Sequence, residues 1–265
     1  MGNTSNKEET TSAGEKAIED EQKAFSAKRN KKRLDRDVEK ETASLVARAA
    51  DGGVHKIVET MNDMNDKLAL QKDLVVQNGL LNALCAKARS VTEASENSSR
   101  LDFHAANAVE AVGRLIRKLY GDLELTKKES IFYTVALCCE AYSCIAKIRA
   151  QKKWFVTDEM HTYTLEALKH FKEDEKVVFW AVNALYHMSK DGPNIIVSNV
   201  KAMLDSDAKA TLRSALLCQN DDKDIEAHVL LLMSVFDVVN TDDEIFSNDE
   251  NNEVLGIDTN NTLFQ

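Results

Sequence analysis

Residues 176–190 read KVVFWAVNALYHMSK, and residues 68–85 read LALQKDLVVQNGLLNALC. In both stretches the apolar residues recur every three or four positions, which is the period of an amphipathic helix. A third stretch of this kind, DIEAHVLLLMSVFDVV, occupies residues 224–239. It begins about 48 residues after the first quoted stretch, and helical segments that recur at periods of about 30–50 residues are typical of an α-solenoid. We therefore expect a chain built from repeated helices.

The composition supports a helical fold class. The 265 residues include one Pro and nine Gly, and aromatic residues make up 6% of the chain. All-β sandwiches and barrels need many turns, which depend on Gly and Pro, and their strands favour aromatic and β-branched residues. The composition therefore excludes these classes, and we predict an all-α fold.

Short polar breaks divide the chain into the expected helices. Asp51-Gly52-Gly53 ends a helix that begins near Arg33, and Asp191-Gly192-Pro193 is the clearest stop in the chain. Another break is expected at residues 62–66, which read NDMND. Between these breaks the apolar periodicity predicts helices over residues 54–61, 68–88, 101–120, 127–149, 157–171, 177–188, 195–204, 208–217 and 225–239.

Charge and hydropathy divide the chain into three parts. Residues 1–32 are polar and are expected to be a disordered tether that carries a basic cluster. Residues 33–239 form the expected helical repeat domain, and residues 240–265, with seven acids and no Lys or Arg, are expected to be a disordered acidic tail. The net charge of −10 argues against nucleic acid as a partner, because phosphate binding needs clustered Lys and Arg.

Two stretches carry a family resemblance. Gly52-Gly53 precedes the expected short helix at residues 54–61, and a longer helix that ends in LLNALC at residues 80–85 follows it. Residues 178–188, VFWAVNALYHM, look like the same long helix, and the break at Asp191-Gly192 comes after them. In this pattern the chain resembles the armadillo repeat family over about residues 40–239.

The resemblance implies a right-handed superhelix of armadillo/HEAT-like repeats, in which the last helix of each repeat lines a concave groove. Many members of the family bind extended peptides there, and in the nuclear-import members a Trp and an Asn one turn apart hold the peptide backbone. The matching positions here are Asn78 with Asn82, and Asn183 with His187, so no Trp occupies them. The resemblance therefore implies a groove that binds partner proteins, with these four residues as candidate contacts.

The N-terminal sequence MGNTSNK resembles an N-myristoylation site, because removal of Met1 would expose Gly2 for acylation. A single myristoyl chain binds membranes only marginally, so stable anchoring takes a second signal. A basic cluster can supply this signal by attracting an anionic leaflet. A solvated helix start and a nuclear localisation signal are the alternative interpretations of the cluster. It consists of Lys28, Arg29, Lys31, Lys32, Arg33 and Arg36.

A chain that is armadillo-like throughout and begins with an acylatable Gly2-Asn3 is similar to the armadillo-repeats-only proteins that tether secretory organelles in certain parasites. In that subfamily cysteines beside the glycine are palmitoylated, whereas Thr4 and Ser5 stand here. The expected location is cytoplasmic, with peripheral attachment to the cytosolic face of an organelle or of the plasma membrane.

Cysteine and motif patterns do not favour catalysis. The five cysteines are odd in number and match no disulfide scaffold, so reduced, partly buried thiols are expected. Cys138, Cys139 and Cys144 lack the CxxC spacing of a zinc site. Glu140 suggests a thiol site beside them, but no His lies close in sequence. The chain also lacks GxGxxG, GxxxxGK[ST], GxSxG and HExxH motifs.

We therefore expect a non-catalytic scaffold or adaptor with no cofactor, metal or small-molecule substrate. It would bind other proteins through its groove and a membrane surface through Gly2 and the basic cluster. Two alternatives stay open, which are a soluble armadillo-type adaptor or transport receptor without a lipid anchor, and a regulatory subunit of an enzyme. No segment is apolar over a length that could span a bilayer.

Overall fold

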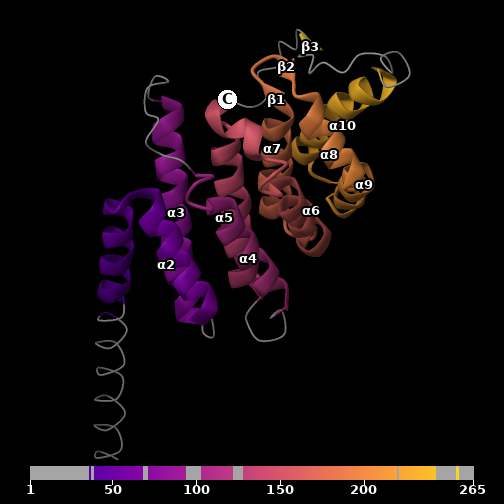
Figure 1. The fold of residues 1–265 in the computed structure, drawn as a ribbon. Helices are drawn as coiled ribbons and strands as arrows, with labels where there is room; N and C mark the ends of the chain where they lie inside the picture. Colours follow the sequence, from indigo (N-terminus) through magenta and orange to yellow (C-terminus); the bar gives the residue numbers. More distant parts are fainter. Residues whose placement is uncertain are drawn as a thin grey trace, which may run out of the picture. The chain divides into compact units, whose positions relative to one another are not determined.

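The computed structural model describes residue 36 and residues 39–67, 71–93, 103–121, 128–219, 221–242 and 255–256. These residues are predominantly helical (Figure 1). The chain divides into two compact units, residues 1–45 and residues 46–265. In the first unit Arg36 and residues 39–45 are helical, and the second unit begins with helical residues 46–51.

The first part of the second unit consists of helices that follow one another in pairs. Apolar periodicity explains why these segments form helices that pack on a core. In α4, for example, the buried side chains on one face include Val109, Val112, Ile116 and Leu119. A 3-10 helix, η1 (Arg149–Trp154), lies between the second and the third pair. The pairs are α2 (Gly53–Lys67) with α3 (Gln71–Glu93), α4 (Ala108–Gly121) with α5 (Lys128–Ala146), and α6 (Met160–Phe171) with α7 (Glu175–Ser189).

A short β-hairpin and three more helices complete the second unit. The strands β1 (Lys190–Asp191) and β2 (Asn194–Ile195) are antiparallel, and β3 (Leu255–Gly256) pairs antiparallel with β2. Gly192 in the hairpin turn has a φ of 61°, in the left-handed region that favours glycine. The helices after the hairpin are α8 (Val197–Asp205), α9 (Ala208–Cys218) and α10 (Lys223–Asp242).

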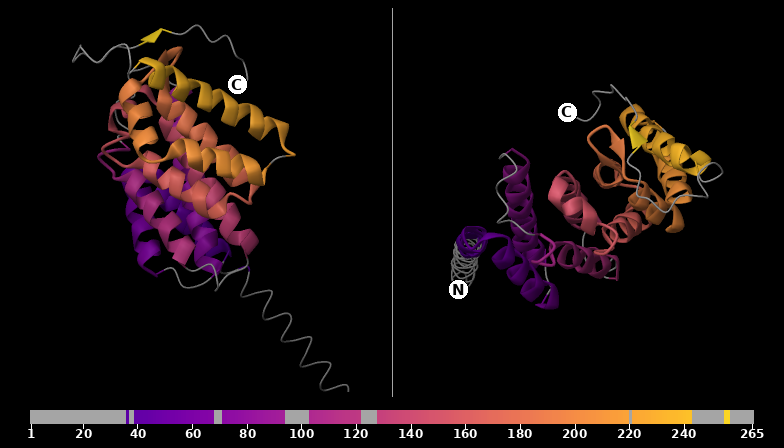
Figure 2. Two further views of the ribbon diagram at one scale, coloured as in Figure 1. Left: turned by 90° about the vertical axis from the view of Figure 1, so that its right-hand side faces the viewer. Right: turned by 45° about the horizontal axis from the view of Figure 1, so that its top comes forward.

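Apart from α8, the labelled helices of the second unit pack in two rows. The α3 row consists of α3, α5, α7 and α10, each in contact with the next, and the α2 row consists of α2, α4, α6 and α9 in the same manner. The two helices of each pair also contact each other across the rows. In Figures 1 and 2 the colours run in this order, from purple α2 and α3 to yellow α10. The apolar core therefore lies between the rows, where Tyr142 of α5 is fully buried and its hydroxyl donates to the Val109 carbonyl of α4 at 2.9 Å.

The predicted helical class is confirmed, and the predicted stop at Asp191-Gly192-Pro193 coincides with the end of α7. The hairpin and η1 were not predicted. The helix expected from residue 101 begins later, at Ala108, because residues 103–107 form turns and Asn107 has a φ of 54°.

The polar break predicted at residues 62–66 is wrong, because these residues continue α2. Within them Asn65 is buried, its Nδ2 donates to the Ala111 carbonyl at 3.1 Å, and its Oδ1 accepts from Gln77 Nε2 at 2.8 Å. A buried amide is tolerated inside a helix when partners satisfy its hydrogen bonds. The polarity of NDMND therefore reflects contacts of α2 with α3 and α4, and it does not mark the end of a helix.

Candidate functional site

Three helices of the α3 row carry polar residues at helical spacing on one face. Residues that are three, four or seven positions apart lie on the same side of a helix. The polar side chains at this spacing on α3, α5 and α7 belong to neighbouring helices, and we treat them as one set. Arg89 pairs with Glu140 between α3 and α5, and Ser143 is hydrogen-bonded to Asn183 between α5 and α7. We call this set the polar strip, and it consists of Asn78, Asn82 and Arg89 of α3, Glu140 and Lys147 of α5, and Asn183 and His187 of α7.

The α3 and α5 parts of the polar strip meet in an ion pair. The guanidinium of Arg89 donates to Glu140 Oε1. The Arg89 side chain is 53% exposed and that of Glu140 is 17% exposed, so the pair lies at the surface. An exposed pair of this kind contributes little to stability, and both of its charges can be reached by a partner.

The α5 and α7 parts of the polar strip meet at His187. Burial, followed by the positive charges of Lys147 and Lys152, lowers the pKa of His187 to about 3. The imidazole is therefore neutral at physiological pH, and a neutral imidazole has one donor nitrogen and one acceptor nitrogen. Lys147 itself is exposed.

The three amides of the polar strip differ in their surroundings. Asn82 is exposed, whereas Asn183 is 5% exposed and its Oδ1 accepts from Ser143 Oγ of α5 at 2.5 Å. Asn78 is half-buried, and its Oδ1 is buried and accepts no hydrogen bond from the part of the chain that the structure describes. An amide side chain has two donors and an acceptor, so Asn82 has the most capacity for a partner, and Asn183 also contributes to the packing of α5 against α7.

The geometry of the polar strip suits an extended peptide. A peptide backbone presents one donor and one acceptor at each residue other than Pro, and exposed amides such as that of Asn82 can bind both. Arg89, Glu140 and Lys147 add charges of both signs for a partner's side chains.

Of the four predicted groove residues, Asn82 is exposed, Asn78 and His187 are half-buried, and Asn183 is buried. The sequence pattern does not mark Arg89 and Lys147, and it marks Glu140 only as a neighbour of the α5 cysteines and not as a groove residue. The seven-residue interval between Glu140 and Lys147 was visible in the sequence, but charged residues at such an interval also occur on helices that face only solvent. The ion pair joins positions 51 residues apart, and only the packing of α3 on α5 reveals it.

The predicted membrane-binding residues lie almost entirely outside the described part of the chain. Gly2 and the basic residues from Lys28 to Arg33 are not described. Arg36 is described, and it is helical and exposed.

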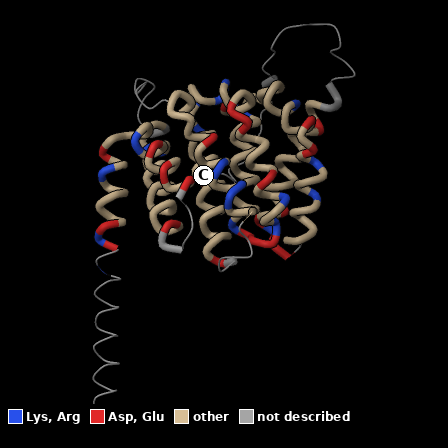
Figure 3. The backbone as a smooth tube through the Cα atoms, turned by 60° about the horizontal axis from the view of Figure 1, so that its bottom comes forward, with Lys and Arg blue, Asp and Glu red and all other residues tan. Residues whose placement is uncertain are grey.

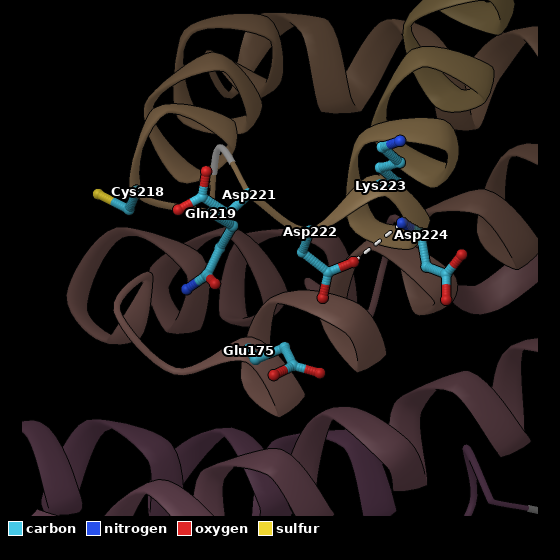
Figure 4. A pocket seen from close by; sticks show the side chains of 7 residues that line it. All are labelled: Glu175, Cys218, Gln219, Asp221, Asp222, Lys223 and Asp224. Carbon is cyan, nitrogen blue, oxygen red and sulfur yellow. Dashed lines mark hydrogen bonds between the residues drawn. The ribbon is translucent and has the colours of Figure 1, made fainter.

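A pocket of about 570 Å³ lies where the N-terminal ends of α7 and α10 meet the end of α9 (Figure 4). Its carboxylates come from Glu175, Asp221, Asp222 and Asp224. Asp222 Oδ1 accepts from the backbone nitrogens of Asp224 at 2.9 Å and Ile225 at 3.0 Å. Asp222 therefore caps the first turn of α10. We attribute the acidic lining of the pocket to this helix terminus and not to a ligand site.

Charged residues of both signs are interspersed over the described helices (Figure 3). Among the described residues, no group of three or more His, Cys, Asp and Glu side chains could hold a metal ion. No described helix combines the length and the apolar character that crossing a bilayer requires.

Comparison with known proteins gives no further assignment. The chain matches no protein-family model, no curated protein and no solved structure.

Proposed function

We propose that this chain is a non-catalytic, armadillo-like interaction scaffold that binds an extended segment of a partner protein along the polar strip. The observation that carries the proposal is the continuity of the strip over three neighbouring helices. The Arg89–Glu140 ion pair joins α3 to α5, and the effect of Lys147 on His187 links α5 to α7. Amides, a neutral imidazole and charges of both signs are suited to a peptide backbone and its side chains.

The proposal includes a right-handed superhelix of armadillo/HEAT-like repeats. The supporting observation is that paired helices alternate between the α2 row and the α3 row, with each helix in contact with its neighbours in both directions. Stacked repeats of this kind produce extended concave binding surfaces. In the proposed superhelix the α3 row lines the concave groove.

The proposal also places the protein at the cytosolic face of a membrane. Its support is the sequence, in which Met1-Gly2 begins a stretch that resembles an N-myristoylation site, with Asn6 at the position where Ser or Thr is usual, and a basic cluster follows at residues 28–36. One acyl chain and one basic cluster together satisfy the two-signal requirement for stable attachment.

Binding is tested by capturing partners in cells, isolating the shortest peptide that binds, and measuring its Kd with purified variants. We expect Asn82→Ala and Glu140→Ala each to weaken binding by about tenfold, which corresponds to about 1.4 kcal/mol, without a change in melting temperature. Glu110→Ala is the matched control, because Glu110 is exposed on α4 in the α2 row. Equal affinity of all three variants would place the binding surface elsewhere.

Membrane attachment is tested with the wild type and Gly2→Ala in cells, by fractionation and by the intact mass of the purified chain. We expect a myristoyl group and membrane recovery for the wild type, and neither for Gly2→Ala. Replacing Lys28, Arg29, Lys31 and Lys32 with Gln should lower membrane recovery while leaving the acyl group in place. A wild-type chain that is unmodified and wholly in the soluble fraction would refute the anchor.

A further inference from the structure

The hairpin after α7 carries a third strand that comes from the acidic tail, residues 240–265. Asn194 of β2 pairs with Gly256, and Ile195 pairs with Leu255, so β3 adds a strand to the edge of β2 (Figure 1). The edge of a sheet presents backbone groups that an extended segment can bind as a further strand. Ile195 is 2% exposed, so the core holds β2 in place. The hairpin is therefore a docking site, and a segment of the tail occupies it.

The hairpin contacts a basic part of the chain. Residues 141–157 include the end of α5 and η1, and they contain four basic side chains and no acidic one in a chain whose net charge is −10. Arg149 Nε lies 3.1 Å from Asp191 Oδ2 of β1, and Lys152 Nζ lies 3.7 Å from Asp191 Oδ1. Lys152 Nζ also donates to the carbonyl of Lys190. We call the four side chains the basic surface, and it consists of Lys147, Arg149, Lys152 and Lys153.

Capping of α7 accounts for only one of these four cations. Lys152 Nζ donates to the His187 carbonyl at 3.4 Å in the last turn of α7, where the helix dipole favours a positive charge. The Lys152 side chain is 12% exposed. By contrast, the Arg149 side chain is 76% exposed, and Lys147 and Lys153 are also exposed. Three positive charges close to the hairpin are therefore accessible to an acidic ligand.

The acidic tail has the complementary charge. It contains seven acids and no Lys or Arg. Glu253 precedes β3 by two residues and Asp258 follows it by two, and two residues of chain span at most about 7 Å. Pairing of β3 with β2 therefore keeps both acids near the hairpin that Arg149 and Lys152 contact. Attraction between exposed charges at such a separation is strongest at low ionic strength.

We propose that the edge of β2 and the basic surface together form an intramolecular docking site for the acidic tail. The backbone pairing of β3 fixes the position of the tail, and the carboxylates on either side of β3 neutralise the basic surface. Because the tail belongs to the same chain, its effective concentration at the site does not depend on the protein concentration. The tail of a second copy would have to displace a segment that is already tethered.

The docking site borders one end of the polar strip. Lys147 belongs to both, and Lys152 Nζ contacts the carbonyl of His187. A docked tail neutralises a charge that a partner's side chain would otherwise contact, so it raises the apparent Kd of the strip as the undocked fraction falls. This regulatory effect rests on the proposed function, whereas the docking of the tail does not.

Zero-length cross-linking tests the contact between the tail and the basic surface. The purified full-length chain is treated with a carbodiimide, which joins a Lys amine to a carboxylate in contact with it, and the monomer is mapped by mass spectrometry. We expect cross-links from Lys147 or Lys153 to acids of the tail, and several-fold fewer of them at high salt. The exposed Lys169 and Lys176 are the internal controls and should give few cross-links to the tail.

The role of β3 is tested with Leu255→Pro in the full-length chain. Proline cannot donate a hydrogen bond to a strand ladder, so the variant should lose most of the cross-links between the tail and the basic surface. Hydrogen exchange measures the strand pairing directly. The peptide that covers residues 189–197 should exchange several-fold faster in Leu255→Pro than in the wild type.

A tail-neutralised variant separates the effect of charge from that of the strand. It should also exchange faster at residues 189–197, and it should bind the partner peptide several-fold more tightly than the wild type. The matched control combines Asp221→Asn with Asp224→Asn, because these two acids are exposed and lie outside the tail. The tail-neutralised variant combines Asp249→Asn, Glu250→Gln, Glu253→Gln and Asp258→Asn.

Several results would overturn the docking site. Cross-links of the tail that are as frequent at Lys169 and Lys176 as at the basic surface would show that the contact is not specific. Cross-links that appear only in covalent dimers would assign the contact to a second copy. Unchanged cross-links and exchange in Leu255→Pro would show that β3 does not hold the tail.

The regulatory effect has its own decisive result. An equal Kd for the wild type and the tail-neutralised variant would refute the effect on the polar strip, even where cross-links establish docking. If no peptide binds the polar strip, the proposed function fails, and cross-linking and hydrogen exchange still decide whether the tail docks.

Discussion

The α2 row and the α3 row are held together by different kinds of contact. In the α2 row, α4 and α6 approach closely where Gly113 faces the Tyr163 ring, and a Cβ at Gly113 would lie 2.5 Å from three ring atoms. In the α3 row, α5 and α7 are joined by the buried hydrogen bond from Ser143 to Asn183. The α2 row thus depends on the absence of a side chain at one position, and the α3 row depends on the presence of particular polar groups.

This difference determines which changes each row tolerates. Added volume cannot be absorbed where two helices are already in contact, because protein interiors are close-packed. Removal of one partner from a buried hydrogen bond leaves the other unsatisfied. The α2 row should therefore be most sensitive to larger side chains, and the α3 row to the loss of polar ones.

The largest effect is expected for Gly113→Val. The new side chain would displace the Tyr163 ring, and overpacking of this kind lowers the free energy of unfolding by about 3 kcal/mol. The matched control is Gly121→Val in the same helix, because a Cβ at Gly121 meets nothing within 4 Å. Urea unfolding measures both variants, and the control should stay within about 0.5 kcal/mol of the wild type.

The close approach can also be tested by a double-mutant cycle. In a Tyr163→Ala background the ring is absent, so Gly113→Val should cost much less than it does alone. Equal costs in both backgrounds would show that the contact between Gly113 and Tyr163 does not limit the approach of α4 to α6.

An intermediate effect is expected for Asn183→Ala. The substitution removes the acceptor of the Ser143 hydroxyl in the interior, and an unsatisfied buried group costs about 2 kcal/mol. Asn82→Ala is the matched control, because Asn82 is an exposed amide of the same row, and its free energy of unfolding should change by less than about 0.5 kcal/mol. Thermal and urea unfolding of both variants provide the measurement, and equal losses would contradict the distinction between buried and exposed amides.

The sequence predicts the helices well because their signal is local. The apolar periodicity of residues 177–188 needs no knowledge of neighbours, and α7 spans Glu175–Ser189. Residues 62–66 show the limit of local inference. Asn65 interrupts the apolar pattern, and only its contacts with Ala111 and Gln77 explain why the helix continues.

The candidate site is predicted in part for the same reason. Asn82 and Asn183 follow from a resemblance between two helices, but their different burial depends on which residues face them. The pairing of Arg89 with Glu140 depends wholly on the packing of α3 against α5.

The smallest effect is expected for Glu166→Gln in the α2 row. Arg117 of α4 donates two hydrogen bonds of 2.9 Å to the Glu166 carboxylate of α6, but the two side chains are 50% and 31% exposed. Water and salt screen such a pair, so its loss should lower the free energy of unfolding by less than about 0.5 kcal/mol, and high salt should abolish the difference. Urea unfolding at low and high salt measures this. A loss comparable to that of Gly113→Val would mean that charge, and not close packing, holds α4 against α6.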